Sequence, residues 1–246
     1  GNTFRLSGPA GAVAASVTYD AATRTATLQP SLGLSPSSTY TAQLLTGIAD
    51  SAGNPLAPLS WSFTTASAPA VGLLNGGFEI DSNGDSRPDS WTGNAKFTRS
   101  SAIAPHGESF AGQFLASDNS GVTISQVVSN IVPGVSYDFG GWTNIPPTAD
   151  SFTLTYEVRW QSASNSTLGT SSIKTYNAAT NGWEQTKATL LAPAGAAKAQ
   201  VRVVVSSLNA TLYVDDLAFG NTPPPADTTP PTVGARVPAA GATGVL

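Results

Sequence analysis

The sequence carries a dense run of acidic side chains near the end of its first third. Glu79, Asp81, Asp85 and Asp89 hold four of the chain's 15 acidic residues within one short stretch. Their mutual repulsion costs free energy unless a cation or a basic side chain lies among them. This stretch is therefore the first place to look for a metal site.

The run from 81 to 89 places oxygen donors at every second position, as in a calcium loop. Ca²⁺ takes about 6–8 oxygen ligands, and a tight loop can turn alternate positions to one side. An EF-hand-like loop would have Gly and Glu where this chain has Ser86 and Thr92. The alternative is a solvated loop without an ion. The expected Ca²⁺ ligands are Asp81, Asn83, Asp85, the backbone carbonyl of Arg87, and Asp89.

Aromatic side chains form the second set of candidates, because flat rings stack on sugars while a few polar groups bind hydroxyls. Trp142 follows two glycines, Gly140 and Gly141, whose missing side chains could open a groove. Tyr156 and Trp160 are four residues apart on one expected strand and should share a face. These three aromatic residues are the candidates for glycan stacking. The alternative for each is a place in the core.

Catalysis has little support in the sequence. The single histidine, His106, lies in an expected loop without a Gly-x-Ser-x-Gly elbow, and the chain has no cysteine. The carboxylates cluster in loops rather than forming a pair that would face a cleft, as a glycosidase needs. We predict that the chain is not an enzyme.

The composition indicates a folded protein with a weakly charged surface. Of 246 residues, 40% are hydrophobic and 11% are charged. Typical globular domains have about 25% charged residues, and a lower charged fraction is common in extracellular β-proteins. The net charge of −4, with scattered Lys and Arg, argues against a nucleic-acid partner. No apolar run is long enough to insert into a membrane. The chain has neither Cys nor Met, and we interpret it as a processed or excised piece of a longer product.

Residues 1–66 alternate apolar and polar side chains in short runs that predict a small β-sandwich. The expected strands are 13–19, 25–28, 39–45 and 60–65. The runs 17–28 (VTYDAATRTATL), 34–40 (LSPSSTY), 48–56 (IADSAGNPL) and 61–65 (WSFTT) resemble the bacterial Ig-like domains of S-layer and other cell-surface proteins. The resemblance implies a partial domain that lacks its first strands.

Residues 67–221 predict a second all-β domain of eight or nine strands, whose spacing suits a jelly roll. The segments 75–79 (NGGFE), 192–196 (APAGA) and 213–217 (YVDDL), together with Trp183 after Gly182, resemble jelly-roll carbohydrate-binding modules of the family 4, 9 and 22 type. The fold class is thus all-β, an incomplete Ig-like sandwich followed by a galactose-binding-like jelly roll. The segment 75–79 is expected to be the opening strand.

This second resemblance implies a structural Ca²⁺ that joins the opening strand, a following loop and the last strand. Carried over, it points to Glu79, Glu108 or the carbonyls near Gly107, and Asp215. Asp215 lies in an otherwise apolar strand, where a carboxylate is costly unless it is paired or metal-bound. The alternative is a buried carboxylate that accepts hydrogen bonds from backbone N–H groups.

Residues 222–246 combine a stiff Pro-rich linker with a segment, 227–246, that resembles the opening of another Ig-like domain. The two ends of the chain thus resemble complementary pieces of one repeat unit. One interpretation is a fragment of a tandem array. The other is a polymer in which the last strand of one subunit completes the open sandwich of the next by strand complementation.

Taken together, these patterns predict a non-catalytic, extracellular structural or adhesive segment of a secreted surface or filament-forming protein. Its jelly roll would be stabilised by Ca²⁺ and would be of carbohydrate-binding type. The expected partners are a polysaccharide and a second copy that associates through the incomplete Ig-like domain. The alternative is the polysaccharide-binding region of a secreted multidomain enzyme that acts on glycans.

Overall fold

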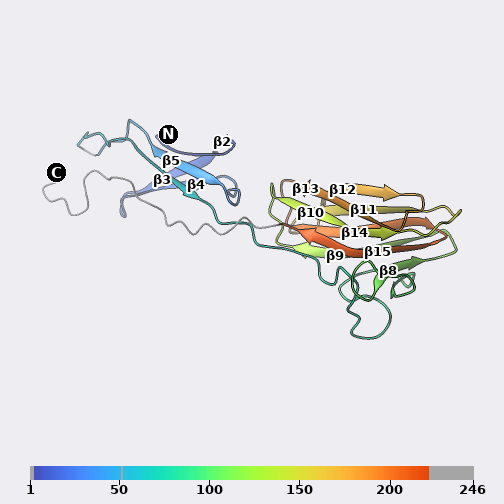
Figure 1. Ribbon diagram of the computed structural model, residues 1–246. Coiled ribbons are helices and arrows are strands. Elements are labelled where there is room, and N and C mark those ends of the chain that lie inside the picture. The colour runs from blue at the N-terminus through green and yellow to red at the C-terminus, as the bar shows by residue number, and fades with distance from the viewer. Residues whose placement is uncertain (1–2, 51, 222–246) are drawn as a thin grey trace. The chain divides into compact units, whose positions relative to one another are not determined.

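The computed structural model describes residues 3–50 and 52–221, which form strands and loops without a helix. These residues divide between Ser67 and Ala68 into two compact units (Figure 1). We call residues 3–67 the first unit and residues 68–221 the second unit. The prediction of an all-β fold is confirmed, whereas the predicted linker and strand at 222–246 lie outside the described residues. No helix in the described part is long and apolar enough to cross a membrane.

The first unit is a small sandwich of two sheets. One sheet has the strand order β2-β1-β5-β6, and the other is the β3-β4 hairpin, with antiparallel pairing throughout. At the hairpin turn, Asp20 accepts a hydrogen bond from the Ala22 N–H at 2.8 Å, and Arg24 adopts a φ of 54°. The strands are β1 (Phe4–Gly8), β2 (Gly11–Ala12), β3 (Ala15–Asp20), β4 (Thr25–Pro30), β5 (Thr39–Leu44) and β6 (Leu59–Thr64).

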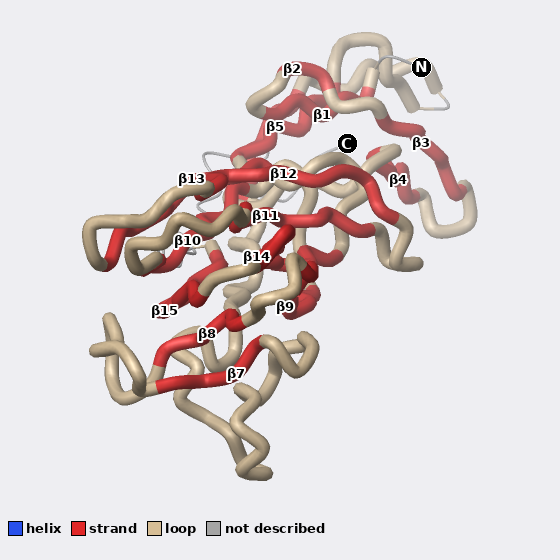
Figure 2. Tube along the Cα trace, turned by 90° about the vertical axis from the view of Figure 1, so that its right-hand side faces the viewer, coloured by secondary structure: helices blue, strands red, loops and turns tan. Residues whose placement is uncertain are grey.

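The second unit is the expected jelly roll, with two antiparallel sheets packed face to face (Figures 1 and 2). The five-stranded sheet has the order β13-β10-β15-β8-β7, and the four-stranded sheet has the order β12-β11-β14-β9. The strands are β7 (Phe97–Ser100), β8 (Ala111–Leu115), β9 (Ser120–Ser129), β10 (Ser136–Asn144), β11 (Thr153–Gln161), β12 (Thr167–Tyr176), β13 (Trp183–Leu191), β14 (Lys198–Leu208) and β15 (Thr211–Gly220).

Alternation of side chains builds the core between these two sheets. In β11 the even-numbered residues from Leu154 to Trp160 are buried, while Glu157 and Arg159 face outward. β14 repeats this pattern beside it, with Tyr156 opposite Val203 in the register. The outer polar side chains pair across the strands, as in the ion pair between Arg202 and Glu157. The sheet therefore presents one apolar face to the core.

The predicted opening strand at 75–79 is not a strand. Asn75 and Phe78 adopt φ values of 51° and 61°, which interrupt an extended backbone. The segment still lies against β15, because the Leu217 N–H donates to the Gly76 carbonyl at 2.9 Å. A Cβ at Gly76 would lie 2.0 Å from the Leu217 carbonyl oxygen, so this close approach requires glycine.

Candidate functional site

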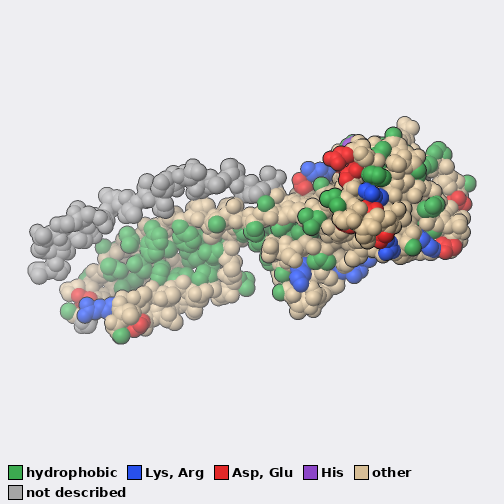
Figure 3. Space-filling view, turned by 90° about the horizontal axis from the view of Figure 1, so that it is seen from below, with side chains coloured by type: hydrophobic (Ala, Val, Ile, Leu, Met, Phe, Trp, Pro, Cys, Tyr) green, Lys and Arg blue, Asp and Glu red, His purple; other side chains and the backbone are tan. Residues whose placement is uncertain are grey.

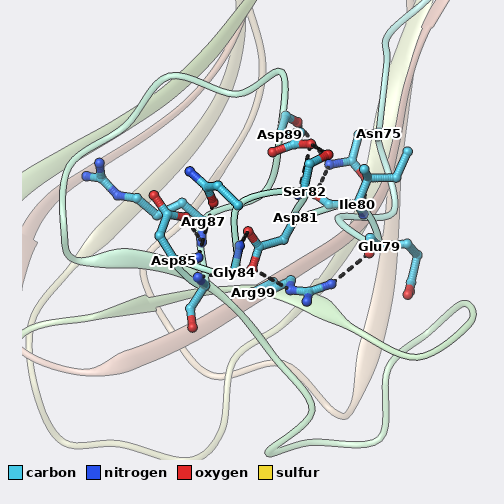
Figure 4. A network of polar contacts seen from close by, with 12 residues as sticks. Asn75, Glu79, Ile80, Asp81, Ser82, Gly84, Asp85, Arg87, Asp89 and Arg99 are labelled. Atoms are coloured by element: carbon cyan, nitrogen blue, oxygen red, sulfur yellow. Dashed lines mark hydrogen bonds and ion pairs between the residues drawn. The ribbon is translucent and has the colours of Figure 1, made fainter.

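The carboxylates of the acidic loop bind the loop's own backbone (Figure 4). Asp81 accepts hydrogen bonds from the N–H groups of Gly84 at 2.9 Å and Ser86 at 3.0 Å. Asp85 accepts one from the Arg87 N–H at 2.9 Å. Ser86 adopts a φ of 67°, the left-handed conformation that the expected glycine would favour. The side chains thus stabilise a series of tight turns.

Arg99 supplies a basic partner for this loop. Its Nε atom lies 3.3 Å from Asp81 Oδ2, and the Asp81 side chain is 2% exposed. Its Nη1 atom donates to the Glu79 carbonyl at 2.7 Å, and its guanidinium lies 4.1 Å from the centre of the Phe110 ring. Because the cation pairs with this buried carboxylate, it offsets part of the repulsion among the acids.

Glu79 and Asp215 both bind the loop at 106–110, the loop to which the second resemblance pointed. Asp215 Oδ2 accepts hydrogen bonds from the N–H groups of His106 at 2.9 Å and Gly107 at 3.1 Å. Glu79 Oε1 accepts hydrogen bonds from the N–H groups of Ser109 and Phe110, both at 2.8 Å. The Asp215 side chain is buried, and its burial raises the pKa of the carboxyl group. Glu108, between these donors, is exposed.

In the described part of the chain, no three His, Cys, Asp or Glu side chains lie close enough together to hold a metal ion. Several of the carboxylate oxygens proposed as ligands instead accept N–H hydrogen bonds. This arrangement matches the metal-free alternatives for both acidic sites. Calcium binding stays a prediction for both acidic sites.

Tyr156 and Trp160 were wrong choices as glycan-stacking residues. They do share a face, but it is the core face, where their exposed fractions are 0% and 2%. The Tyr156 hydroxyl donates to the Trp142 carbonyl at 3.1 Å, and Trp160 Nε1 donates to Ser171 Oγ at 3.0 Å. Burial also raises the pKa of the Tyr156 hydroxyl. Neither ring can meet a sugar.

Trp142 lies instead on the outer face of the five-stranded sheet. The His106 ring stacks on it, with centroids 3.7 Å apart and 17° between the planes. His106 Nδ1 lies 2.7 Å from Asp216 Oδ2, and the Trp183 ring meets the imidazole edge-on at 6.1 Å. Trp183 Nε1 donates to the Ala104 carbonyl at 3.0 Å, which holds the loop before His106 against β13.

A bulge in the sheet orients these groups. The register between β10 and β15 shifts between Gly140 and Trp142, and Asp216 adopts a φ of 47° opposite the shift. Such bulges re-aim side chains, and non-glycine residues in this conformation are strained. Packing requires glycine at position 140, because a Cβ there would lie 2.2 Å from the Thr186 carbonyl oxygen. A Cβ at Gly141 would lie 2.4 Å from the end of the Leu217 side chain, which would have to shift.

A cavity of about 400 Å³ opens on this outer face. Trp142 and Asp216, the two residues that contact the His106 ring, both line this cavity. Charged and amide residues line the same cavity, and the ion pair between Lys187 and Asp138 measures 3.0 Å. The polar lining residues are Asp138, Gln185, Thr186, Lys187, Asp216 and Asn221.

Sequence reasoning placed Trp142 among the candidates but missed the residues around it. His106 was placed in a loop and considered only as a catalytic residue, and Asp216 was not named as a candidate. These two residues are 110 positions apart and meet because β15 runs beside β10 under the 101–110 loop. No local pattern in the sequence signals such a contact.

Comparison with known proteins gives one family and several structural likenesses. No curated protein matches this sequence. Three similar structures share under 20% identity with it. The enzymatically active domain of bacteriophage CBA120 tailspike protein 4 has 17% identity and a TM-score of 0.49, covering 60% of this chain and 21% of the tailspike. This chain therefore corresponds to about a fifth of the tailspike.

The other two are carbohydrate-binding modules. The C-terminal family 22 module of Clostridium thermocellum Xyn10B has 17% identity and a TM-score of 0.45, covering 59% of this chain and 90% of the module. TmCBM61, solved with beta-1,4-galactotriose, has 19% identity and a TM-score of 0.44, and the match covers 60% of this chain and 95% of TmCBM61. At the level of sequence families, residues 1–65 match the model of the bacterial Ig-like domain.

Proposed function

We propose that the second unit is a non-catalytic polysaccharide-binding region. The observation that carries the proposal is the cavity beside Trp142, where an indole ring adjoins Gln185 and the Lys187–Asp138 pair. An aromatic platform with a few polar groups is the usual chemistry of a sugar site. The sequence likeness of residues 75–79 and 213–217 to carbohydrate-binding modules supports the same function.

The proposed setting is a secreted, surface-exposed protein. Its weakly charged, Ser- and Thr-rich sequence and its Ig-like unit favour a structural or adhesive segment. The same features also suit the alternative, a binding region attached to a glycan-active enzyme. Calcium remains part of the proposal for the 81–89 loop, where alternate oxygens and the φ of Ser86 fit a cation-binding turn.

Affinity electrophoresis in gels that contain xylan or β-1,4-galactan would test the binding proposal. We expect retardation of the native chain by at least one of these neutral polysaccharides. Trp142→Ala should weaken binding by about 10–100-fold, the equivalent of losing roughly 1.5–3 kcal/mol of aromatic burial. If the native chain shows no retardation in either gel, the proposal fails for these polysaccharides.

Two lysines give a matched control for the position of the site. Lys187 lines the cavity, whereas Lys198 lies on β14 of the opposite sheet and donates to Asn165 at 2.7 Å. Lys187→Ala should weaken retardation, because it removes a hydrogen-bond donor beside Trp142. Lys198→Ala removes the same chemical group and should leave retardation unchanged. Equal effects would place the site elsewhere.

Self-association through the first unit is the second proposed function. The observation that favours it is the exposure of large aromatic side chains that should line a sandwich core, since Trp61 is 43% exposed and Phe63 is 39% exposed. Burial of such rings against another chain is favourable. Sedimentation over a range of concentrations would test it.

A further inference from the structure

The first unit has an apolar inner face that its own described residues leave open. Its buried cluster contains only Leu6, Tyr40 and Ala42. Every residue of β3 and of β6 is exposed, although both strands alternate apolar and polar side chains. Figure 3 shows the resulting broad hydrophobic area in the left half of the view. Contiguous apolar areas of this kind mark interaction sites.

Two cavities between the sheets form one groove along this face. A cavity of about 550 Å³ separates β1 from β3, and one of about 240 Å³ lies among β4, β5 and β6. Both cavities are lined by Phe4, Leu6 and Leu28. We call the combined site the inter-sheet groove. Its apolar walls are Phe4, Leu6, Val17, Leu28, Trp61 and Phe63.

The groove is bordered by strand edges that carry unpaired backbone groups. Within the described residues, β3 pairs only with β4, and β6 pairs only with β5. An unpaired edge is a template for another strand, which gains main-chain hydrogen bonds while its alternate side chains enter pockets. The groove thus suits one extended strand with apolar residues on a single face.

The sequence contains a stretch with this pattern outside the described residues. From Thr232 to Val237 apolar and polar positions alternate, with Val233, Ala235 and Val237 on one face. Pro231 and Pro238 bound this stretch, and proline cannot donate to a sheet ladder. The strands β3 to β6 each span 6 residues, the same length as this stretch.

We infer that residues 232–237 of a second copy of this sequence dock in the inter-sheet groove, with Val233 and Val237 facing Leu28 and Trp61. This inference rests on the proposed self-association and names its contact. Each copy carries one groove and one donor strand, so the contact is head-to-tail and generates an open chain of copies. Two copies joined in one longer polypeptide would make the same contact.

Analytical ultracentrifugation of the full 246-residue chain tests the inference. We expect the average mass to rise above 24.9 kDa with concentration. Val233→Asp with Val237→Asp should weaken association at least about tenfold, because charges would enter an apolar groove. Thr232→Asp with Gly234→Asp adds the same charge to the opposite face and should associate like the native chain. Both variants leave every described residue unchanged.

A mixing experiment identifies the acceptor. Leu28→Asp should block the groove and keep the donor strand, whereas V233D/V237D keeps the groove and loses the donor. Each variant alone should be monomeric, and an equimolar mixture should form heterodimers. If Leu28→Asp unfolds the first unit, the comparison of V233D/V237D with T232D/G234D still decides the question.

Three outcomes would overturn the inference. If V233D/V237D associates as tightly as the native chain, self-association stands but uses another contact. If the native chain stays monomeric and the V233D/V237D variant melts at a lower temperature than the native chain, each groove is filled by its own chain. If the native chain stays monomeric and the variant melts normally, both the inference and the proposed self-association fail. Polysaccharide retardation is independent of all three.

Discussion

The two units use the same pattern of alternating side chains but differ in how far it is buried. In the second unit, the apolar faces of two sheets cover each other, and Tyr137, Phe139, Tyr156 and Trp160 are at most 2% exposed. In the first unit, the corresponding faces meet only around Leu6, Tyr40 and Ala42. Alternation therefore determines which face of a strand is apolar, whereas a covering layer determines whether that face becomes a core.

The largest expected contrast comes from one tryptophan in each unit. Trp160→Ala should destabilise the second unit by about 3–5 kcal/mol, because it empties a closed core. Trp61→Ala should cost the first unit less than about 1 kcal/mol at concentrations where the chain is monomeric, since its ring is already 43% exposed. Denaturant unfolding of both variants measures the contrast, and equal losses would show that the first unit is closed.

Much of the fold followed from the sequence because burial in the second unit obeys this alternation. The expected number of strands in residues 67–221, eight or nine, is confirmed by the nine strands β7 to β15. Three strands were missed, and one of them, β2, has only two residues. β12 is rich in Ser, Thr and Gly, so its ten residues carry no clear apolar face, and β1 is a short segment of mixed character.

The candidate site was predicted less well, for a related reason. Alternation put Tyr156 and Trp160 on one face, but it does not say whether that face meets the other sheet or solvent. The pairing of His106 with Asp216 depends on strand order and on the bulge at Gly140–Trp142, both of which are properties of the whole sheet. Glu79 and Asp215 were linked correctly to one loop, yet only through a family resemblance.

Calcium removal is the next comparison, and it should change the thermal stability of one unit only. If Ca²⁺ binds the acidic loop, excess chelator should lower the melting temperature of the second unit and leave the first unchanged. An ion present at 100 times its dissociation constant stabilises the native state by about 2.7 kcal/mol. Differential scanning calorimetry with EDTA, and with Mg²⁺ or Ca²⁺ restored, measures this. Identical curves in all three conditions would leave Arg99 as the cation that stabilises the loop.

Two adjacent carboxylates allow a finer comparison within the second unit. Asp215→Ala should destabilise it by about 1–3 kcal/mol, because the partly buried N–H groups of His106 and Gly107 lose their acceptor. Asp216→Ala removes a side chain that is 42% exposed and should cost less. Chemical denaturation compares the two variants. A larger loss for Asp216→Ala would mean that its contact with His106 holds the loop.

The smallest expected effect concerns the pKa of exposed carboxyl groups. A different interaction lowers this pKa in each unit. In the second unit, hydrogen bonding to the Lys96 ammonium lowers the pKa of Asp118 from 3.8 to about 2. In the first unit, the Asn54 side chain lowers the pKa of Asp50 without a lysine. Because folding depresses the pKa of Asp118, its stabilising contribution is present above pH 3.8 and is lost as the pH falls through about 2.

Lys96→Met should therefore return the pKa of Asp118 toward 3.8 and leave that of Asp50 unchanged. High salt should raise the pKa of Asp118 in the native chain more than that of Asp50, since salt screens an exposed ion pair. Carboxyl NMR titration of both residues measures these shifts, with Lys198→Met as the matched control. If the pKa of Asp118 does not move in the Lys96 variant, the hydrogen bonds from Ser120 set it. If it moves equally in the Lys198 variant, the loss of one positive charge, and not of the Lys96 contact, is responsible.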